Sequence, residues 1–347
     1  MLSVFKGGPR AVLVASAFSV VAFAAHEASA QSAEAFYKGR NTIDMMVGTN
    51  PGGGYDLYGR LVARYMGDYL PGKPTMVVKN MPGAGHLKMV NWMYNAAPKD
   101  GSVVGGAPQA LAIEQALESE GIQYDAAKFI YIGRAAPVVE VTYTWHTSPA
   151  KTLEDARKRE TIMGGSGPTS PTVFYLKLLN NLAGTNFKII ASYSGTAEVQ
   201  LGIERGEIEG GSKAWESMKV DNADWLRDKK VNILLQYATE PAPDLPGVPL
   251  FSDLGKTPED KAALKLYAFG NELGRAFMTT PGVPADRVAL LRKAFMDAMT
   301  SPQMKAEAEK TKVALGPMDG AKVADLINQT LDTPKAVLEK ARANRGY

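Results

Sequence analysis

Residues Gly48 to Asp56 read Gly-Thr-Asn-Pro-Gly-Gly-Gly-Tyr-Asp, and they separate a short apolar run from a longer amphipathic one. The run before them, residues 43–47, has the length of a β-strand, whereas residues 57–66 place apolar side chains at helical spacing. The glycines therefore lie at a turn from a strand into a helix. Because the first amides of a helix have no partner within it, and glycine lets a ligand approach the backbone closely, such a turn readily receives an anion.

On its own, this glycine run is also compatible with an ordinary structural turn. It lacks the Gly-Lys-Ser/Thr ending of a phosphate-binding P-loop and the spaced glycines of a dinucleotide-binding loop. Asp56 could be catalytic, but an acid favoured by the helix dipole, or a hydrogen-bond anchor for the loop, is the simpler interpretation. The anion-binding interpretation gains weight because similar turns recur along the chain.

Three further predicted strands are followed by loops that carry small or hydroxyl residues. These loops are Asn-Met-Pro-Gly-Ala-Gly at 80–85, Ser-Gly-Pro-Thr-Ser-Pro at 166–171 and Ser-Tyr-Ser-Gly-Thr at 192–196. Each loop precedes a predicted helix, and two of the four turns fall in each half of the chain. Strands that alternate with helices predict an α/β fold in which mainly parallel sheets are flanked by helices and ligands bind beyond the carboxyl ends of the strands.

Length and composition favour two domains. The chain has 347 residues, of which 45% are hydrophobic and 22% charged, as in globular proteins. A β-rich passage is interrupted at residues 135–137, where we expect the chain to cross between domains, and residues 266–270 and 275–279 look like extended segments that could return it. The predicted boundaries are 31–135 plus 275–347 for domain 1 and 136–274 for domain 2.

Residues 1–30 have the features of a secretory signal peptide. Lys6 and Arg10 precede an apolar run at 11–25, and Ala-Ser-Ala at 28–30 fits a cleavage site. The run is shorter than the roughly 20 residues that a membrane span needs, and a retained N-terminal anchor is the alternative interpretation. The chain has no cysteine, so neither a lipid-attachment site nor a disulfide framework is expected. We therefore predict a periplasmic protein that is not lipid-anchored.

Charge and composition argue against several other functions. The net charge is +3 and falls to +2 without the leader, which gives no reason to propose nucleic acid or an anionic membrane as a partner. Only His86 and His146 remain after the leader, so a histidine metal cluster is not expected, and each histidine is interpreted as structural or solvated. Ser166 lies in Gly-Gly-Ser-Gly-Pro, where Pro168 occupies a position at which a nucleophile elbow needs glycine. We predict no cofactor and no catalytic triad.

Several segments, taken in their order and spacing, resemble the solute receptors of the tripartite tricarboxylate transporters, also called the Bug family. The similarity spans most of the mature chain. The segments that carry it are 51–56 (PGGGYD), 80–85 (NMPGAG), 97–101 (APKDG), 166–170 (SGPTS), 193–197 (YSGTA), 246–249 (PGVP), 253–255 (DLG) and 281–284 (PGVP).

The resemblance implies a hinged two-domain periplasmic binding protein of the Venus flytrap type, type II-like and monomeric. Such a receptor closes on a small carboxylate (a di- or tricarboxylate, or an aromatic one) and delivers it to a membrane permease of one large and one small subunit. In that family, loop amides hold the carboxylate with the help of hydroxyls and bound water. The ligand-binding residues expected here are Asn50, Gly52, Gly53, Gly54, Tyr55, Asp56, Pro82, Gly83, Ala84, Ala107, Ser166, Gly167, Thr169, Ser170, Tyr193, Gly195, Thr196, Ser212 and Trp215.

The sequence also departs from the family pattern. Tyr55 replaces a small hydroxyl residue, Ser194 stands where lysine is common, and the usual histidine after Pro171 and a later aspartate beyond residues 207–212 are missing. Tyr55 and Trp215 could stack on a larger or aromatic carboxylate. Two alternatives stay open: a cleft enzyme, such as a hydrolase or lyase that uses Ser166 or Asp56, and a sensory ligand-binding module.

Overall fold

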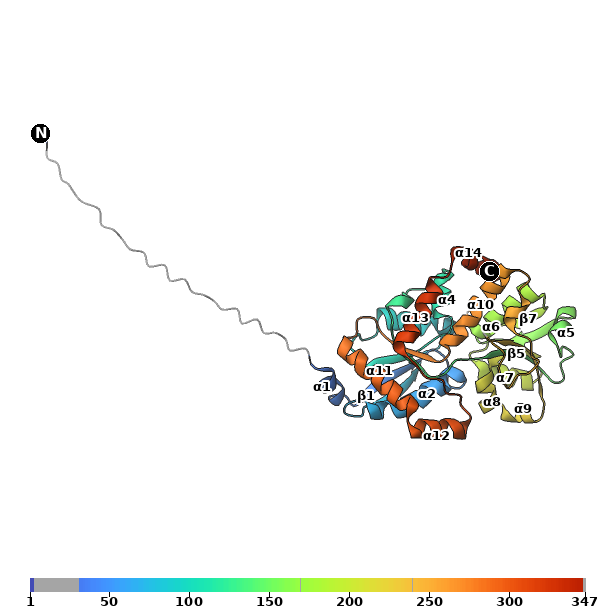
Figure 1. Ribbon diagram of the computed structural model, residues 1–347, viewed down its shortest axis with the longest axis horizontal. Helices are drawn as coiled ribbons and strands as arrows, with labels where there is room; N and C mark the ends of the chain where they lie inside the picture. The colour runs from blue at the N-terminus through green and yellow to red at the C-terminus, as the bar shows by residue number, and fades with distance from the viewer. Residues whose placement is uncertain (3–30, 169, 239, 346–347) are drawn as a thin grey trace. The chain divides into compact units, whose positions relative to one another are not determined.

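The computed structural model describes residues 1–2, 31–168, 170–238 and 240–345. Apart from its first two residues, the predicted signal peptide lies outside this range. Ser32–Tyr347 form one compact unit, which contains every described helix and strand (Figure 1). None of the described helices combines the length and apolar character needed to cross a membrane.

The described strands form two sheets, in the orders β11-β4-β10-β3-β1-β2 and β7-β6-β8-β5-β9. The strands of the first sheet are β1 (Thr42–Val47), β2 (Thr75–Asn80), β3 (Val103–Ala107), β4 (Ile130–Arg134), β10 (Ala276–Thr279) and β11 (Met318–Asp319). Those of the second are β5 (Glu140–Trp145), β6 (Thr161–Gly164), β7 (Phe187–Ile190), β8 (Gly210–Ala214) and β9 (Val231–Tyr237).

Both sheets are mixed, whereas the sequence had indicated mainly parallel ones. In the first sheet β1 is parallel to β2 and β3, but β10 is antiparallel to β3 and β4, and β11 is antiparallel to β4. In the second sheet β6 is parallel to β7 and β8, but β5 is antiparallel to β8 and β9. The difference arises because β5 and β10 each enter a sheet directly after the chain has crossed from the other one, against the direction of their neighbours.

Helices cover both sheets. They are α1 (Ala33–Lys38), α2 (Gly54–Met66), α3 (Leu87–Asn95), α4 (Leu111–Ala116), α5 (Leu153–Lys158), α6 (Pro171–Leu178), α7 (Thr196–Glu204), α8 (Trp215–Asp221), α9 (Ala223–Arg227), α10 (Pro258–Leu273), α11 (Ala285–Thr300), α12 (Pro302–Thr311), α13 (Gly320–Leu331) and α14 (Lys335–Arg345). Short additional helical turns are η1 (Gly67–Tyr69), η2 (Ala84–His86), η3 (Ala126–Lys128), η4 (Leu179–Ala183) and η5 (Phe251–Leu254).

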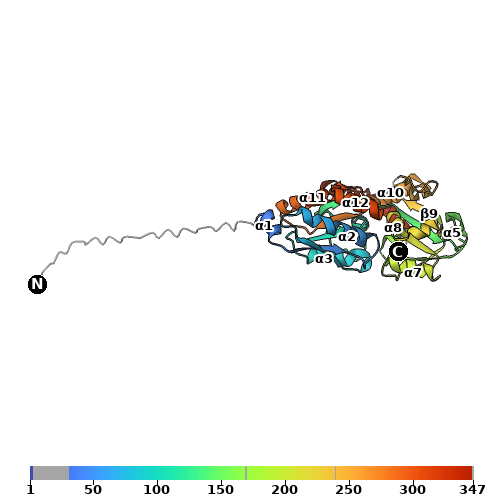
Figure 2. The same cartoon turned by 90° about the horizontal axis from the view of Figure 1, so that it is seen from below.

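Alternate residues of the first sheet face two separate cores. Met45 and Phe277 pack with residues of α2, α11 and α12, whereas their neighbours Met46 and Met278 pack with α3, α4 and α13. This alternation follows from the period of two in a β-strand. Figure 2 shows α11 and α3 on opposite sides of this sheet.

The second sheet is covered in the same way. Tyr237 packs in a cluster with residues of α6 and α10, whereas Tyr143 packs with residues of α7, α8 and α9 on the other face. Because each sheet is apolar on both faces and enclosed by helices, its loops at the strand ends are left as the positions where polar backbone groups can reach a ligand.

Two crossing segments, residues 135–139 and 274–275, connect the sheets. The Ala135 amide donates to the Arg275 carbonyl and the Arg275 amide to the Ala136 carbonyl, both at 2.8 Å. Strands of the first sheet come from residues 42–134 and 276–319, and those of the second from 140–237, while α14 packs on α10 and α6. The domain boundaries at 135/136 and 274/275 stay a prediction.

Most predicted helices and strands are present, including the helix start at Thr152, whose capping box with Asp155 is formed. One prediction is wrong: residues 266–270 are not extended but belong to α10. An unbroken apolar run cannot by itself distinguish a buried helix from a strand. The ambiguity arises here because α10 is packed on several sides, by α4, α13 and α14.

Candidate functional site

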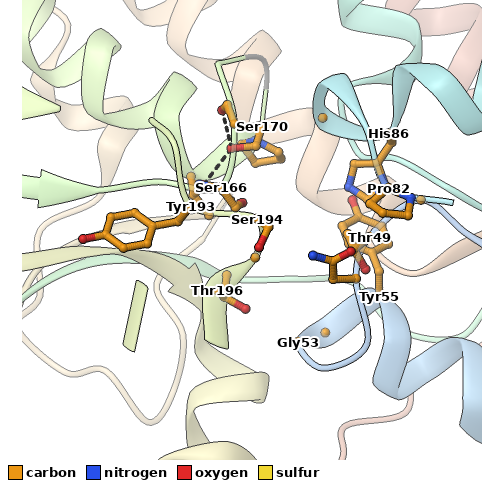
Figure 3. A pocket seen from close by; sticks show the side chains of 18 of the residues that line it. Thr49, Gly53, Tyr55, Pro82, His86, Ser166, Ser170, Tyr193, Ser194 and Thr196 are labelled. Carbon is orange, nitrogen blue, oxygen red and sulfur yellow. Dashed lines mark hydrogen bonds between the residues drawn. The ribbon is translucent and has the colours of Figure 1, made fainter. Parts of the chain in front are cut away.

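A cleft of about 320 Å³ lies where loops from both sheets meet. Residues after β1 and β2 line one side and residues after β6 and β7 line the other, as the labelled side chains in Figure 3 show. Each loop leads into a helical segment, which is α2, η2 with α3, α6 or α7. The four glycine-containing or hydroxyl-containing turns that the sequence singled out therefore border one cavity.

Most of the predicted ligand-binding residues line this cleft. They are Asn50, Gly52, Gly53, Gly54, Tyr55, Pro82, Gly83, Ala84, Ser166, Gly167, Ser170, Tyr193, Gly195 and Thr196. Thr169 lies outside the described residues. Asp56, Ala107, Ser212 and Trp215 are not part of the lining, and the contacts of each explain why.

Asp56 anchors the first loop from behind. Its carboxylate accepts hydrogen bonds from the Gly52 amide at 2.9 Å, from Arg60 Nε at 2.8 Å and from Asn80 Nδ2 at 2.9 Å. Burial alone raises the pKa of Asp56, but the hydrogen bonds from Arg60, Gly52 and Asn80 outweigh it and hold the pKa below its usual value. An ionised carboxylate that accepts these hydrogen bonds fixes the first loop, and its role in binding a ligand stays a prediction.

The other three residues lie in the packed interior. Ala107 is fully buried at the end of β3 among apolar side chains. Ser212 Oγ bonds Thr142 Oγ1 at 2.9 Å inside the second sheet. Trp215 packs in the cluster beneath α7 to α9, and its Nε1 donates to Asp244 at 2.9 Å, so its ring is not available for stacking on a ligand in the cleft.

The first loop presents main-chain donors to the cleft. Helix α2 begins at Gly54, and its N-cap Gly53 has φ 80°, a conformation that favours glycine. Within the described part of the chain, the amides of Gly53, Gly54 and Tyr55 have no protein acceptor. These donors and the positive end of the 13-residue helix attract a negative charge.

Some amides in the other loops already have partners. The Ser166 amide donates to Thr172 Oγ1 at 2.9 Å, and the Ser194 amide donates to the Glu198 carboxylate at 2.9 Å. The ring of Tyr193 points away from the cleft in Figure 3, and its hydroxyl lies near Glu207. On this side, the start of α7 at Gly195 and Thr196 is the element that most resembles the first loop.

Sequence reasoning missed a group of buried charged and polar residues in the lining. We call Glu140, Lys213, Ser217 and Arg275 the cleft floor, because they are buried and lie at or near the crossing segments. The other unexpected lining residues are Gly48, Thr49, Gly85, His86, Pro171, Thr172, Ser194 and Ala214. A single charge within an apolar segment, as at Glu140 in Val-Val-Glu-Val, is the signal that could have revealed the floor.

Burial sets the protonation of the cleft. Desolvation raises the pKa of Glu140 to about 7, with Arg275 and Lys213 opposing the rise and Glu216 adding to it. Desolvation also lowers the pKa of His86 to about 4, assisted by the positive charge of Arg275. His86 is thus neutral at pH 7 and packs edge-on against Tyr55 with ring centroids 4.4 Å apart. His146 is exposed and is not part of the cleft lining.

The two cationic residues of the cleft floor differ in their partners. Lys213 Nζ donates to Asp221 and to Asn222, each at 2.8 Å, so its charge is paired. The Arg275 guanidinium stacks on the Tyr55 ring with its carbon 4.5 Å from the ring centroid. Among the described residues, no group of three metal-ligating side chains is placed to hold a metal ion.

Comparison with known proteins gives relatives of low sequence identity and similar fold. No family model matches the chain. The chain is 25% identical over 336 residues to the UPF0065 protein in gbd 5'region of Cupriavidus necator. The aligned part covers 94% of each of the two chains.

Three solved structures illustrate the similarity of fold. MatC of Rhodopseudomonas palustris with bound malate is 19% identical, with a TM-score of 0.68 over 86% of this chain and 98% of that one. An R. palustris protein with adipate is 17% identical, with a TM-score of 0.68 over 88% and 97%. The periplasmic binding protein BugD is 18% identical, with a TM-score of 0.67 over 86% and 97%. The chain therefore has the two-domain fold of periplasmic solute-binding proteins, and the proteins to which it is similar are those of the TctC and Bug type that its loop sequences resemble.

Proposed function

We propose that the protein is a periplasmic solute receptor that captures a small carboxylate between its two sheets and delivers it to a tripartite tricarboxylate-type membrane permease. The observation that carries the proposal is the meeting of four loops in one cavity, with unpartnered amides at the start of α2. MatC with malate and the R. palustris protein with adipate, which share the fold, support a carboxylate as the guest.

The cavity has the size and chemistry for this role. Its volume of about 320 Å³ falls within the range for small-molecule sites. Each hydrogen bond to a charged group contributes about 1.5–3 kcal/mol, so a few of them offset desolvation and closure and leave micromolar binding, which corresponds to about 8 kcal/mol. A ligand held from both sides stabilises the closed arrangement by its differential affinity, and the permease would then recognise that arrangement.

No specific observation favours an enzyme. Ser166 Oγ lies 3.1 Å from Thr172 Oγ1, and no base within the described part of the chain bonds it. Asp56 does not line the cavity, and its carboxylate accepts hydrogen bonds from three donors. Neither residue that the enzyme alternative relied on is placed for nucleophilic or general base catalysis.

Thermal unfolding with a panel of carboxylates tests the proposed function. The protein is first unfolded and refolded to remove carried-over ligand. A ligand present at a hundred times its Kd adds about 2.7 kcal/mol of stability, which raises the unfolding midpoint. Mass spectrometry of the recovered ligand must show it unchanged. Absence of a shift with any carboxylate, or chemical conversion of the ligand, contradicts the proposal.

A further inference from the structure

The Arg275 guanidinium is buried in the cleft lining with unused donors. Only 3% of the residue is exposed, and the residue lines the cavity. Its Nε and Nη1 atoms are buried and have no acceptor among the described protein groups. Its side chain stacks on the rings of Tyr55 at 4.5 Å and Tyr58 at 5.8 Å, and it also contacts the Tyr55 hydroxyl. Unsatisfied buried donors on a charged group are costly, so an arginine in this state favours a bound acceptor.

The protein supplies no direct counter-ion for this charge. Within the described residues, no carboxylate oxygen lies within 4.0 Å of an Arg275 nitrogen. Glu140 is buried and Glu216 is half-buried, and desolvation raises the pKa of each carboxyl, that of Glu140 to about 7. Lys213 is already paired with Asp221. Arg275 therefore has no carboxylate of the described residues at contact distance, which leaves its free donors for an anion that enters the cleft.

Two further groups converge with Arg275. Ser217 Oγ is buried and has no partner among the described groups. A Cβ atom at Gly54 would lie 2.5 Å from Arg275 Nη2 and 2.6 Å from Ser217 Oγ, so the first residue of α2 passes directly beside both side chains. Guanidinium, hydroxyl and the unpartnered amides at the start of α2 thus lie next to one another in the lining.

We propose that Arg275 is a specificity-determining residue that pairs with a carboxylate of the solute at the cleft floor, assisted by Ser217 and the start of α2. This inference rests on the proposed function and adds a charged side chain to the loop amides as a recognition element. The planar guanidinium offers two parallel N–H groups to the two carboxylate oxygens, which selects a carboxylate over an uncharged group of the same shape.

Isothermal titration with matched acids and amides tests this pairing. The probes are succinate, malate, adipate and hexanoate, each compared with the derivative in which every carboxylate is an amide. For the tightest-binding acid, we expect Arg275→Gln to weaken binding 10- to 100-fold and to reduce the acid-to-amide affinity ratio by a similar factor. Arg275→Lys keeps the positive charge but lacks the two parallel N–H groups of the guanidinium. Its affinity for the acid should therefore fall between those of the wild-type protein and Arg275→Gln. Ser217→Ala weakens binding of the acid by a smaller factor.

Arg134→Gln is the matched control. Arg134 is also a buried arginine, on β4 directly opposite the residue that follows Arg275, but its guanidinium bonds the carbonyls of Glu272 and Gly316 and does not line the cleft. This variant should lose stability and keep the acid-to-amide ratio. Circular dichroism verifies the fold of each variant, and Arg275→Lys provides the comparison if Arg275→Gln does not fold.

The outcomes separate the two claims. If the wild-type protein binds the acids but the Arg275 variants keep its acid-to-amide ratio, Arg275 has only a structural role and the inference is wrong while the receptor function stands. If the wild-type protein binds none of the probes or other carboxylates, the proposed function fails and the inference fails with it. If the acid-to-amide affinity ratio falls in the Arg275 variants but not in Arg134→Gln, both the receptor function and the role of Arg275 are supported.

Discussion

At the scale of single residues, Glu140 is the group whose burial has the clearest measurable consequence. It begins β5, only 5% of it is exposed, and its Oε2 has no partner among the described groups. Desolvation raises its pKa to about 7, compared with roughly 4.3 for an unfolded glutamate. Between these two values the folded protein holds a proton that the unfolded chain has released. The stability that the folded protein gains from neutral Glu140 is therefore complete at low pH, and it is lost as the pH rises through about 7.

Glu140→Gln should therefore stabilise the protein relative to wild type more at pH 8 than at pH 5, by about 1–3 kcal/mol. The glutamine stays neutral at both pH values, whereas the wild-type carboxyl must ionise in a buried position. Urea unfolding at the two pH values measures the difference. Glu154→Gln serves as the control, since hydrogen bonding to Arg157 lowers the pKa of this exposed residue and leaves it ionised at both pH values. An equal effect of Glu140→Gln at pH 5 and pH 8 would refute the expectation.

At the scale of the element, two helices carry similar carboxylate anchors in different surroundings. Asp56 in the first turn of α2 is 4% exposed and holds the Gly52 amide, whereas Glu198 in the first turn of α7 is exposed and holds the Ser194 amide. Both follow the preference for acids at helix starts. Only the buried anchor leaves unsatisfied donors behind when it is removed.

Asp56→Ala should cost about 1–3 kcal/mol of stability and weaken ligand binding, because the Gly52 amide, Arg60 and Asn80 lose a charged acceptor and the glycine loop loosens. Glu198→Ala is the matched variant and should leave stability nearly unchanged, since water replaces its exposed contact. Urea unfolding and titration with the ligand identified in the carboxylate screen provide both readouts. Equal losses in the two variants would show that burial of the anchor is unimportant.

At the scale of the whole molecule, loops of the two sheets approach each other across the cleft. A Cβ atom at Gly53 would lie 2.7 Å from Thr196 Oγ1, and one at Gly167 would lie 3.9 Å from the Gly85 amide nitrogen. Gly53 follows β1 of the first sheet, and Thr196 begins α7 beyond β7 of the second. These loops of the two sheets thus lie close together across the cleft, and we expect opening of the cleft to separate them about the crossing segments.

A double variant, Gly53→Cys with Thr196→Cys, should form a disulfide across the cleft, because a Cβ atom at Gly53 would lie 2.7 Å from Thr196 Oγ1 and the natural chain has no competing cysteine. The φ of 80° at Gly53 strains any side chain there, so the stability of each variant is measured as well. We expect a bound carboxylate to speed disulfide formation, and the oxidised protein to exchange ligand more than tenfold more slowly. Non-reducing electrophoresis and ligand release after dilution measure the two effects. Gly53→Cys alone is the control, and cross-linking that is insensitive to ligand would contradict closure driven by the solute.

The four loops that border the cleft were predictable because they depend on local properties of the chain. Gly53 with its positive φ, the hydroxyl-rich turns before α6 and α7, and the capping box at Thr152 are encoded within a few residues. The sequence also indicated the alternation of strands and helices. It could not reveal that residues 266–270 are helical, since a segment that is apolar on all sides shows neither the period of a helix nor that of a strand.

By itself, the sequence determined the loops that can bind an anion and the strand ends that carry them, since backbone conformation there follows from nearby glycine, proline and hydroxyl residues. Only the tertiary structure decided what lies beneath those loops. Glu140, Lys213, Ser217 and Arg275 are up to 135 positions apart in the sequence and meet because two crossing segments and the strand β8 bring them into one cavity. Burial then raises the pKa of Glu140 and leaves Nε and Nη1 of Arg275 without an acceptor among the described groups, which no local pattern in the chain can express.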